Sequence, residues 1–225
     1  MTTKSSGMRG TMSVAHAGLW LLPIYAVLLA LSTLTHQPDP DTEFEAFARY
    51  VTTDIFLVSH VLASITGAAL GTIGAVAALA FLLRSPAVRA AVAGVVLTIT
   101  GNVLTTAVFG VAAFAQPALG RAYLNGTPGA SAMYDDVYGT PLLATVGVGL
   151  LMLIAGAISL GSAIARTDRE LHWAGIGYAV FLPLFAVTGF LFSPAQPVAA
   201  AALAVAAVVI AIRLPRTTAR ELHRD

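Results

Sequence analysis

One apolar stretch near residue 65 carries residue types that could do chemistry at helical spacing. Five residues spaced 4, 3, 4 and 3 positions apart share one face of a helix, namely His60, Ser64, Gly67, Gly71 and Gly74. An imidazole such as that of His60 can serve as a general base, a proton acceptor or a metal ligand. The Gly67-x-x-x-Gly71 spacing lets another helix approach closely. This face therefore suits either a ligand site or helix packing.

A second polar face follows in the next apolar stretch, where Thr98, Asn102 and Thr105 recur at helical spacing. With about 1.5 Å of rise per residue, Asn102 lies at a depth similar to that of Gly67. We expect the two stretches to pack through these faces, with Asn102 hydrogen-bonded across the gap that the glycines leave. The other interpretation is a small polar cavity in the outer half of the protein, with the ligand-binding residues His60, Ser64, Asn102, Thr105 and Tyr138.

Carboxylates near His60 raise the possibility of catalysis. Asp54 precedes His60 by about 9 Å along the same helix, and Asp135 stands at the start of a later apolar stretch. A histidine beside a carboxylate can transfer protons in a reaction. The candidate catalytic residues are His60, Asp54 and Asp135.

Haem held between two histidines is the cofactor that the sequence leads us to consider. His16 and His172 match in depth but are very shallow, whereas His36 and His60 differ in depth by several residues. Neither pair is convincing. We therefore predict no cofactor and no metal.

Composition identifies the class of protein that must position these residues. The 225 residues are 57% hydrophobic and only 10% charged, and the mean hydropathy of +0.83 is that of a membrane protein rather than a soluble domain. The absence of cysteine excludes thiolate nucleophiles and thiolate-held metals. A net charge of +1 offers no footprint for nucleic acid. Expected partners are lipids, small molecules, a second copy of the chain or a partner subunit.

Six stretches reach or approach the roughly 20 apolar residues that one membrane span requires. They cover 15–36, 54–83, 88–116, 138–165, 172–193 and 196–213. The predicted fold is an all-α integral membrane protein with one six-helix domain over 15–213, a tail over 1–14 and a basic tail over 214–225.

The basic residues predict the orientation of this domain. All of them except Arg49 and Arg121 fall in loops or tails on one side, and basic loops face the cytoplasm. Both termini are therefore expected in the cytoplasm. The Ala-rich composition favours a bacterial inner membrane.

The first outer loop is predicted to contain a short amphipathic helix near 43–51. Thr42-Glu43-Phe44-Glu45 fits a capping box, and apolar residues then recur at helical spacing. Two spans also contain proline close to tyrosine, as Pro23 with Tyr25 and Pro183 with Tyr178. Such kinks either open a ligand pocket or are ordinary packing irregularities.

These observations leave three functions open, and the sequence contains no HExxH, GxSxG or Walker A motif to choose among them. The leading hypothesis is a multi-pass membrane protein that binds or passes a small or lipophilic molecule through an outward-facing polar pocket. An alternative is a membrane-embedded enzyme that acts on a lipid or isoprenoid-like substrate with a His/Asp acid–base pair. A third is an accessory subunit that docks onto a membrane complex through its GxxxG face.

Overall fold

The computed structural model describes residues 12–34 and 37–221, and the described chain is built of helices without strands. Six helical segments are long and apolar enough to cross a membrane, and they cover Met12–Ser32, Asp54–Leu82, Val88–Leu124, Thr140–Ala165, His172–Gly189 and Ser193–Thr217. The predicted all-α, six-span fold is confirmed.

Several spans consist of more than one helical element. In the first, a helical stretch over 12–19 passes through a turn at Trp20 into α2 (Leu21–Ser32). The second and third join α-helix to π-helix, as α4 (Asp54–Val58), η1 (Ser59–Thr66) and α5 (Gly67–Leu82), then α6 (Val88–Gly110), η2 (Val111–Ala115) and α7 (Gln116–Leu124). The last three are α9 (Thr140–Ala165), α10 (His172–Leu191), and the short η3 (Ser193–Ala195) with α11 (Gln196–Glu221).

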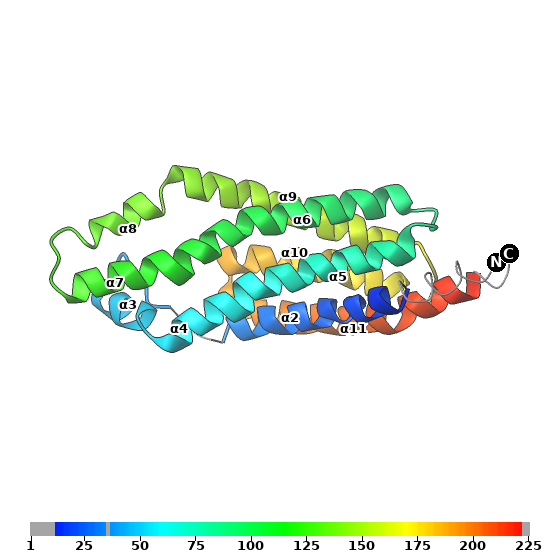
Figure 1. Ribbon diagram of the computed structural model, residues 1–225, viewed down its shortest axis with the longest axis horizontal. Helices are drawn as coiled ribbons and strands as arrows, with labels where there is room; N and C mark the ends of the chain where they lie inside the picture. The colour runs from blue at the N-terminus through cyan, green and yellow to red at the C-terminus, as the bar shows by residue number, and fades with distance from the viewer. Residues whose placement is uncertain (1–11, 35–36, 222–225) are drawn as a thin grey trace, which may run out of the picture.

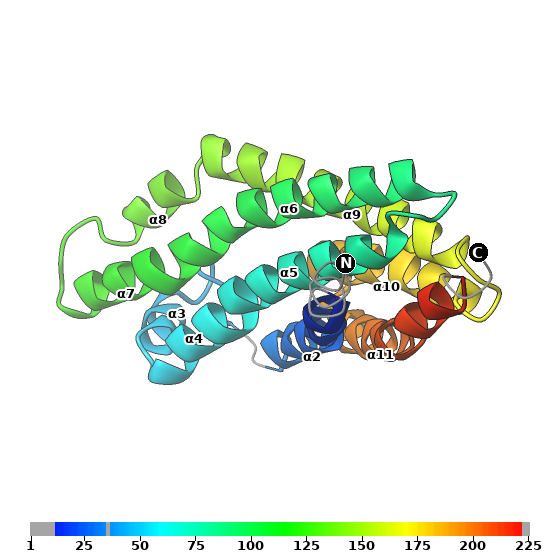
Figure 2. The ribbon, with the colours of Figure 1, turned by 45° about the vertical axis from the view of Figure 1, so that its right-hand side comes forward.

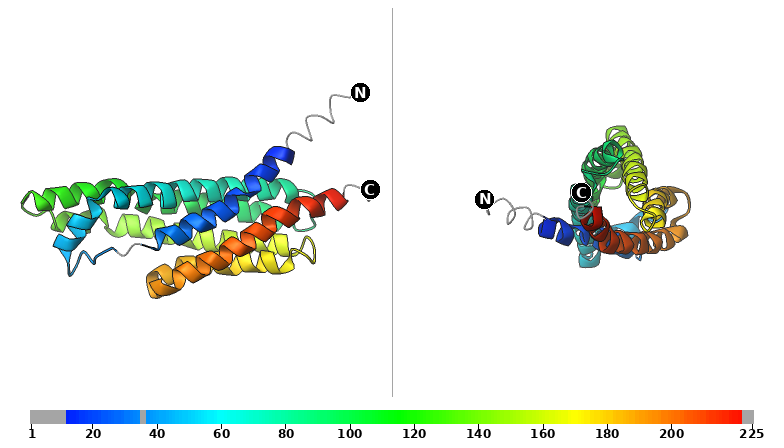
Figure 3. Two further views of the ribbon diagram at one scale, coloured as in Figure 1. Left: turned by 90° about the horizontal axis from the view of Figure 1, so that it is seen from below. Right: turned by 90° about the vertical axis from the view of Figure 1, so that its right-hand side faces the viewer.

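The six spans form a closed ring in chain order. Each span packs against the next one along the chain, and α11 returns to pack against α2. The end view in Figure 3 shows this ring, and Figure 1 shows that the described chain begins and α11 ends at the same end of the bundle. We call this the terminal end, and the opposite end, which carries α3, α7 and α8, the loop end.

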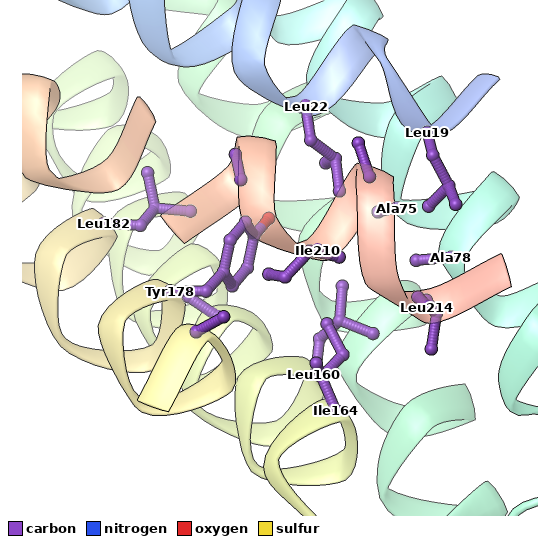
Figure 4. Packing of buried hydrophobic residues seen from close by; sticks show 14 of the residues in the cluster. Leu19, Leu22, Ala75, Ala78, Leu160, Ile164, Tyr178, Leu182, Ile210 and Leu214 are labelled. Carbon is purple, nitrogen blue, oxygen red and sulfur yellow. The ribbon is translucent and has the colours of Figure 1, made fainter. Parts of the chain in front are cut away.

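The half of the ring near the terminal end is filled by a continuous apolar core. Side chains from all six spans meet there, and Figure 4 labels Leu19, Leu22, Ala75, Ala78, Leu160, Ile164, Tyr178, Leu182, Ile210 and Leu214 among them. Each of these ten is at most 1% exposed. The half of the bundle at the terminal end is therefore closely packed, and it adjoins the half at the loop end.

Glycines bring α6 and α9 into close contact along their length. A Cβ atom added at Gly101 would lie 2.6 Å from the backbone nitrogen of Leu153, and one at Gly156 would lie 2.7 Å from the backbone nitrogen of Thr98. Gly94 and Gly149 make equivalent approaches, seven residues from Gly101 and Gly156 respectively. Small residues at such contacts allow helix backbones to approach in a membrane.

Two helices extend beyond the predicted spans, because hydropathy does not mark where helical hydrogen bonding stops. The third helix continues past 116 to Leu124, since Pro117 lies in the first turn of α7, where a missing N–H costs little. The sixth continues past 213 to Glu221, through Pro215. The first ends at Ser32, and residues 35–36 lie outside the described chain.

The loop end projects beyond α2, α10 and α11, and Figure 2 shows it from another side. The predicted amphipathic helix is present as α3 (Phe44–Val51), which buries Phe47, Ala48 and Val51. The predicted capping box is absent, because Glu43 is the N-cap residue and its side chain makes no capping bond. A further short helix, α8 (Ala132–Val137), precedes α9.

Candidate functional site

A central cavity of about 330 Å³ lies in the half of the bundle next to the loop end. All six spans contribute to its wall. The lining residues are Tyr25, Leu29, Ser32 and Thr33 from the first span, Ser64 and Ala68 from the second, Asn102, Thr105, Val108 and Phe109 from the third, Val146, Leu150 and Leu153 from the fourth, Leu182, Phe185, Ala186 and Gly189 from the fifth, and Gln196 from the sixth.

Asn102 is the most constrained polar residue of this wall. Its Nδ2 donates to the backbone oxygen of Ala68 at 3.2 Å and to Oγ1 of Thr72 at 3.0 Å. The predicted bond from Asn102 to the second span is therefore present. Because Asn102 is only 4% exposed, these bonds fix the amide at a defined place in the wall.

Two of the other predicted ligand-binding residues, Ser64 and Thr105, also line the cavity. Thr105 donates its hydroxyl hydrogen to the backbone oxygen of Gly101 at 2.9 Å, one turn earlier. Ser64 lies in η1 and contributes to the cavity wall from the neighbouring second span. The structure thus brings Ser64, Asn102 and Thr105 together around one space.

The two π-helical segments lie against each other beside this space. In η1 the hydroxyl of Thr66 donates to the backbone oxygen of Val61, five residues earlier, at 2.9 Å. The segment η2 begins two residues after Phe109 of the cavity wall. Such π-helical turns are rare in proteins overall, but those that do occur are often found at functional sites.

His60 lies in η1 but does not line the cavity. Its Nδ1 is 2.9 Å from the backbone oxygen of Phe56, and its ring centroid is 4.1 Å from that of the Phe56 ring. Since a carbonyl oxygen only accepts, Nδ1 carries the hydrogen and the neutral ring keeps its lone pair on Nε2. The histidine is held by its own helix rather than by a ligand site.

The carboxylates predicted as partners of His60 lie in separate places. Asp54 lines a hollow of about 240 Å³ with Arg121, whereas Asp135 lines another of about 360 Å³ with Asp41. His60 lines neither hollow. The structure does not bring His60, Asp54 and Asp135 together.

Tyr138 likewise lies outside the cavity, in an aromatic group at the loop end. It accepts a hydrogen bond of 2.5 Å from Nε2 of Gln116 and stacks on Tyr134 with ring centroids 4.6 Å apart. Burial raises the pKa of Tyr138, and the neighbouring Tyr134 adds to this effect while the bond from Gln116 opposes it. This tyrosine closes the bundle beside the fourth span rather than lining the cavity.

The predicted glycine face contacts a different helix from the one expected. A Cβ atom at Gly71 would lie 2.8 Å from the ring of Tyr25, and one at Gly74 would lie 2.8 Å from the side chain of Leu22, while Gly67 also faces α2. The interpretation that these glycines pack against the third span is therefore wrong. Because α2 of the first span lies between the second and sixth spans in the ring, it occupies this face.

Sequence reasoning passed over several residues of the wall. Ser32, Thr33, Phe185 and Gln196 come from the first, fifth and sixth spans, and only the position of Gln196 at the start of a span set it apart. Tyr25, whose hydroxyl lies near Pro23 in the sequence, does line the cavity. The corresponding Tyr178 is buried in the apolar core, and its hydroxyl has no hydrogen-bond partner among the described residues.

The histidines considered for haem lie outside the central cavity or outside the described residues. His16 and His172 are both exposed, and Nδ1 of His172 lies 3.3 Å from the backbone oxygen of Ala165. His36 lies outside the described residues. Over residues 12–34 and 37–221, no three His, Asp or Glu side chains gather where they could hold a metal ion.

Comparisons with known proteins do not identify a family for this chain. No protein-family model matches the sequence, and searches of the curated proteins and of the solved structures found no match.

Proposed function

We propose that this multi-pass membrane protein binds a small lipophilic molecule in its central cavity. The observation that carries the proposal is the cavity itself, because all six spans contribute to its wall. Its volume of about 330 Å³ falls in the range of roughly 300–1,000 Å³ that is usual for ligand sites. Ordinary protein interiors contain few voids larger than a water molecule.

The lining chemistry supports a lipophilic ligand. Most of the wall is aliphatic or aromatic, with a few polar groups from Ser64, Asn102 and Thr105 among others. Such a mixture is typical of small-molecule sites, in which the apolar surface supplies affinity and the polar groups fix orientation. Among the described residues, those of the wall carry no formal charge, whereas ion pathways through membranes use ionisable groups. A neutral molecule therefore fits the site better than an ion.

The position of the cavity favours access from one side of the membrane. It lies in the half of the bundle next to the loop end, above the apolar core. The distribution of basic residues predicts that this end faces outward. The proposal is therefore a site that exchanges its ligand with the outer leaflet or the outer solution.

The other two hypotheses lack comparable support. An acid–base enzyme needs His60 near a carboxylate, and His60 lines neither the hollow of Asp54 nor that of Asp135. Docking through the Gly67-x-x-x-Gly71 face needs that face to be free, and α2 already covers it.

Two neighbouring residues of α10 provide a test with an internal control. Ala186 lines the cavity, whereas Val187 is 37% exposed on the outside of the bundle. We expect Ala186→Phe to fill part of the cavity and Val187→Phe to leave it open. Each protein is purified mildly from its native membrane, and the bound small molecules are compared by native mass spectrometry and by solvent extraction.

A molecule that is retained by the wild type and by Val187→Phe, but depleted from Ala186→Phe, would support the proposal. Identical sets of molecules in the two variants would contradict it. Retention of helix content by both variants, measured by circular dichroism, shows that the comparison concerns the cavity rather than folding.

A further inference from the structure

The hydroxyl groups of the cavity wall have largely donated their hydrogens to the protein itself. Ser32 donates to the backbone oxygen of Leu29 at 2.7 Å, and Thr33 donates to that of Ala30 at 2.7 Å. Thr105 donates to the backbone oxygen of Gly101. A hydroxyl has a single hydrogen, so what these three groups can offer to a ligand is their oxygen lone pairs.

The amide of Asn102, like these hydroxyl groups, offers a hydrogen-bond acceptor to a ligand in the cavity. Both hydrogens on Nδ2 are committed, one to the backbone oxygen of Ala68 and one to Thr72. The oxygen of Ala68 can only accept, so the amide cannot be turned around to place Oδ1 there. Among the described residues no hydrogen bond reaches Oδ1, and it remains an acceptor.

Gln196 adds a further acceptor at the start of α11. Its Nε2 donates to the backbone oxygen of Phe185 at 3.2 Å, which ties the amide across to α10. This bond fixes which side of the amide is nitrogen, because the carbonyl of Phe185 only accepts. Oε1 is therefore left for another partner.

The remaining polar groups do not reverse this balance. The hydroxyls of Tyr25 and Ser64, together with the second hydrogen of the Gln196 amide, can still donate. Asn102 Oδ1 and Gln196 Oε1, however, can only accept. A ligand that carries acceptors alone leaves these two amide oxygens without a donor.

We infer that the cavity prefers an uncharged lipophilic molecule that carries a hydroxyl group, as in a lipophilic alcohol or phenol. The inference rests on the proposed function and names the class of its ligand. The ligand hydroxyl donates to Oδ1 of Asn102, and its hydrocarbon part occupies the apolar side of the wall, formed by Leu150, Leu153 and Phe185 among others. A buried acceptor that stays without a donor disfavours binding, so replacing the hydroxyl by a methyl ether is expected to weaken binding about tenfold.

A matched pair of probes tests this preference on the full-length protein. One probe is a medium-chain alkyl alcohol with a diazirine in the chain, and the other is its methyl ether. Each is titrated into the protein in lipid nanodiscs, photoactivated, and mapped by peptide mass spectrometry. We expect both to label cavity-lining peptides, with half-maximal labelling at about tenfold lower concentration for the alcohol.

Two variants identify the atom responsible. Asn102→Leu removes Oδ1 and should abolish the difference between the probes. Thr72→Val removes one of the same interhelical hydrogen bonds, but Thr72 does not line the cavity, and this variant should keep the difference.

The outcomes separate the inference from the proposed function. Equal labelling of the lining by alcohol and ether in the wild type would overturn the preference for a hydroxyl while leaving a lipophilic site in place. Labelling of the lining by neither probe would overturn both. The comparison of probes in the wild type requires no variant to fold.

Discussion

The contact between α6 and α9 can be tested by adding a single methyl group. In Gly101→Ala the new Cβ would lie 2.6 Å from the backbone nitrogen of Leu153 and 2.8 Å from the backbone oxygen of Gly149. Both neighbours are backbone atoms of a helix, so neither can rotate away, and the two helices must separate. Overpacking of this kind costs about 1–3 kcal/mol, and the upper end applies because backbone opposes backbone.

Alanine also improves helix formation, which offsets part of this cost. The gain in intrinsic propensity over glycine is about 1 kcal/mol, so the expected net loss of stability for Gly101→Ala is about 2 kcal/mol. Gly110 at the end of the same helix is the matched control, because nothing lies within 4 Å of an added Cβ there. Gly110→Ala should be neutral or more stable than the wild type by up to about 1 kcal/mol.

The measurement is reversible unfolding by titration of a mild-detergent solution with a denaturing detergent, followed by circular dichroism. The two variants should differ by about 3 kcal/mol in unfolding free energy. If Gly101→Ala proved as stable as Gly110→Ala, the close approach of α6 and α9 would be refuted.

Three further predictions use the same unfolding assay, protease cleavage or simple spectroscopy. Asn102→Leu should destabilise the protein by about 1–2 kcal/mol, because each interhelical hydrogen bond in a membrane contributes about 0.6 kcal/mol and a lost polar packing partner adds to this. Thr72→Val removes one of the two bonds and should cost about half as much. Equal losses of stability in the two variants would contradict the two-bond geometry. Gly126→Ala should destabilise the loop after α7 by about 1 kcal/mol or more, because Gly126 has a φ of +75°. Gly147→Ala should not destabilise this loop, because an added Cβ at Gly147 meets nothing within 4 Å. Protease cleavage of the loop reports the difference between the two variants. Burial raises the pKa of Tyr138 above its usual value of about 10. Its contribution to stability is therefore complete below about pH 10 and is lost as the pH rises through the folded-state pKa. If the phenolate absorbance that distinguishes the wild type from Tyr138→Phe appeared already at about pH 10, the side chain would be solvated rather than buried.

Much of the fold follows from the sequence because hydropathy determines which segments cross the membrane. The depth argument also placed Asn102 correctly opposite the second span, where it bonds to Ala68 and Thr72. Ends of helices were less predictable, as at Leu124, because backbone hydrogen bonding continues into residues that hydropathy treats as loop.

The candidate site was predictable only in part, because helical spacing identifies a face but not the helix that it meets. The glycine face met α2 rather than the third span. The π-helical turns of η1 also change the direction in which later side chains point. His60 and Ser64 were predicted on one helix face, but only Ser64 reaches the cavity. Residues such as Gln196 enter the wall because all six spans converge, which no single segment reveals.

The ring order of the spans has a consequence for how the protein is made. Because α11 closes the ring against α2, the first five spans enclose the cavity on all sides but one. During synthesis the first five spans form a trough that opens sideways onto lipid tails, and the insertion of α11 converts it into a chamber. A chain that stops after α10 would keep this trough open.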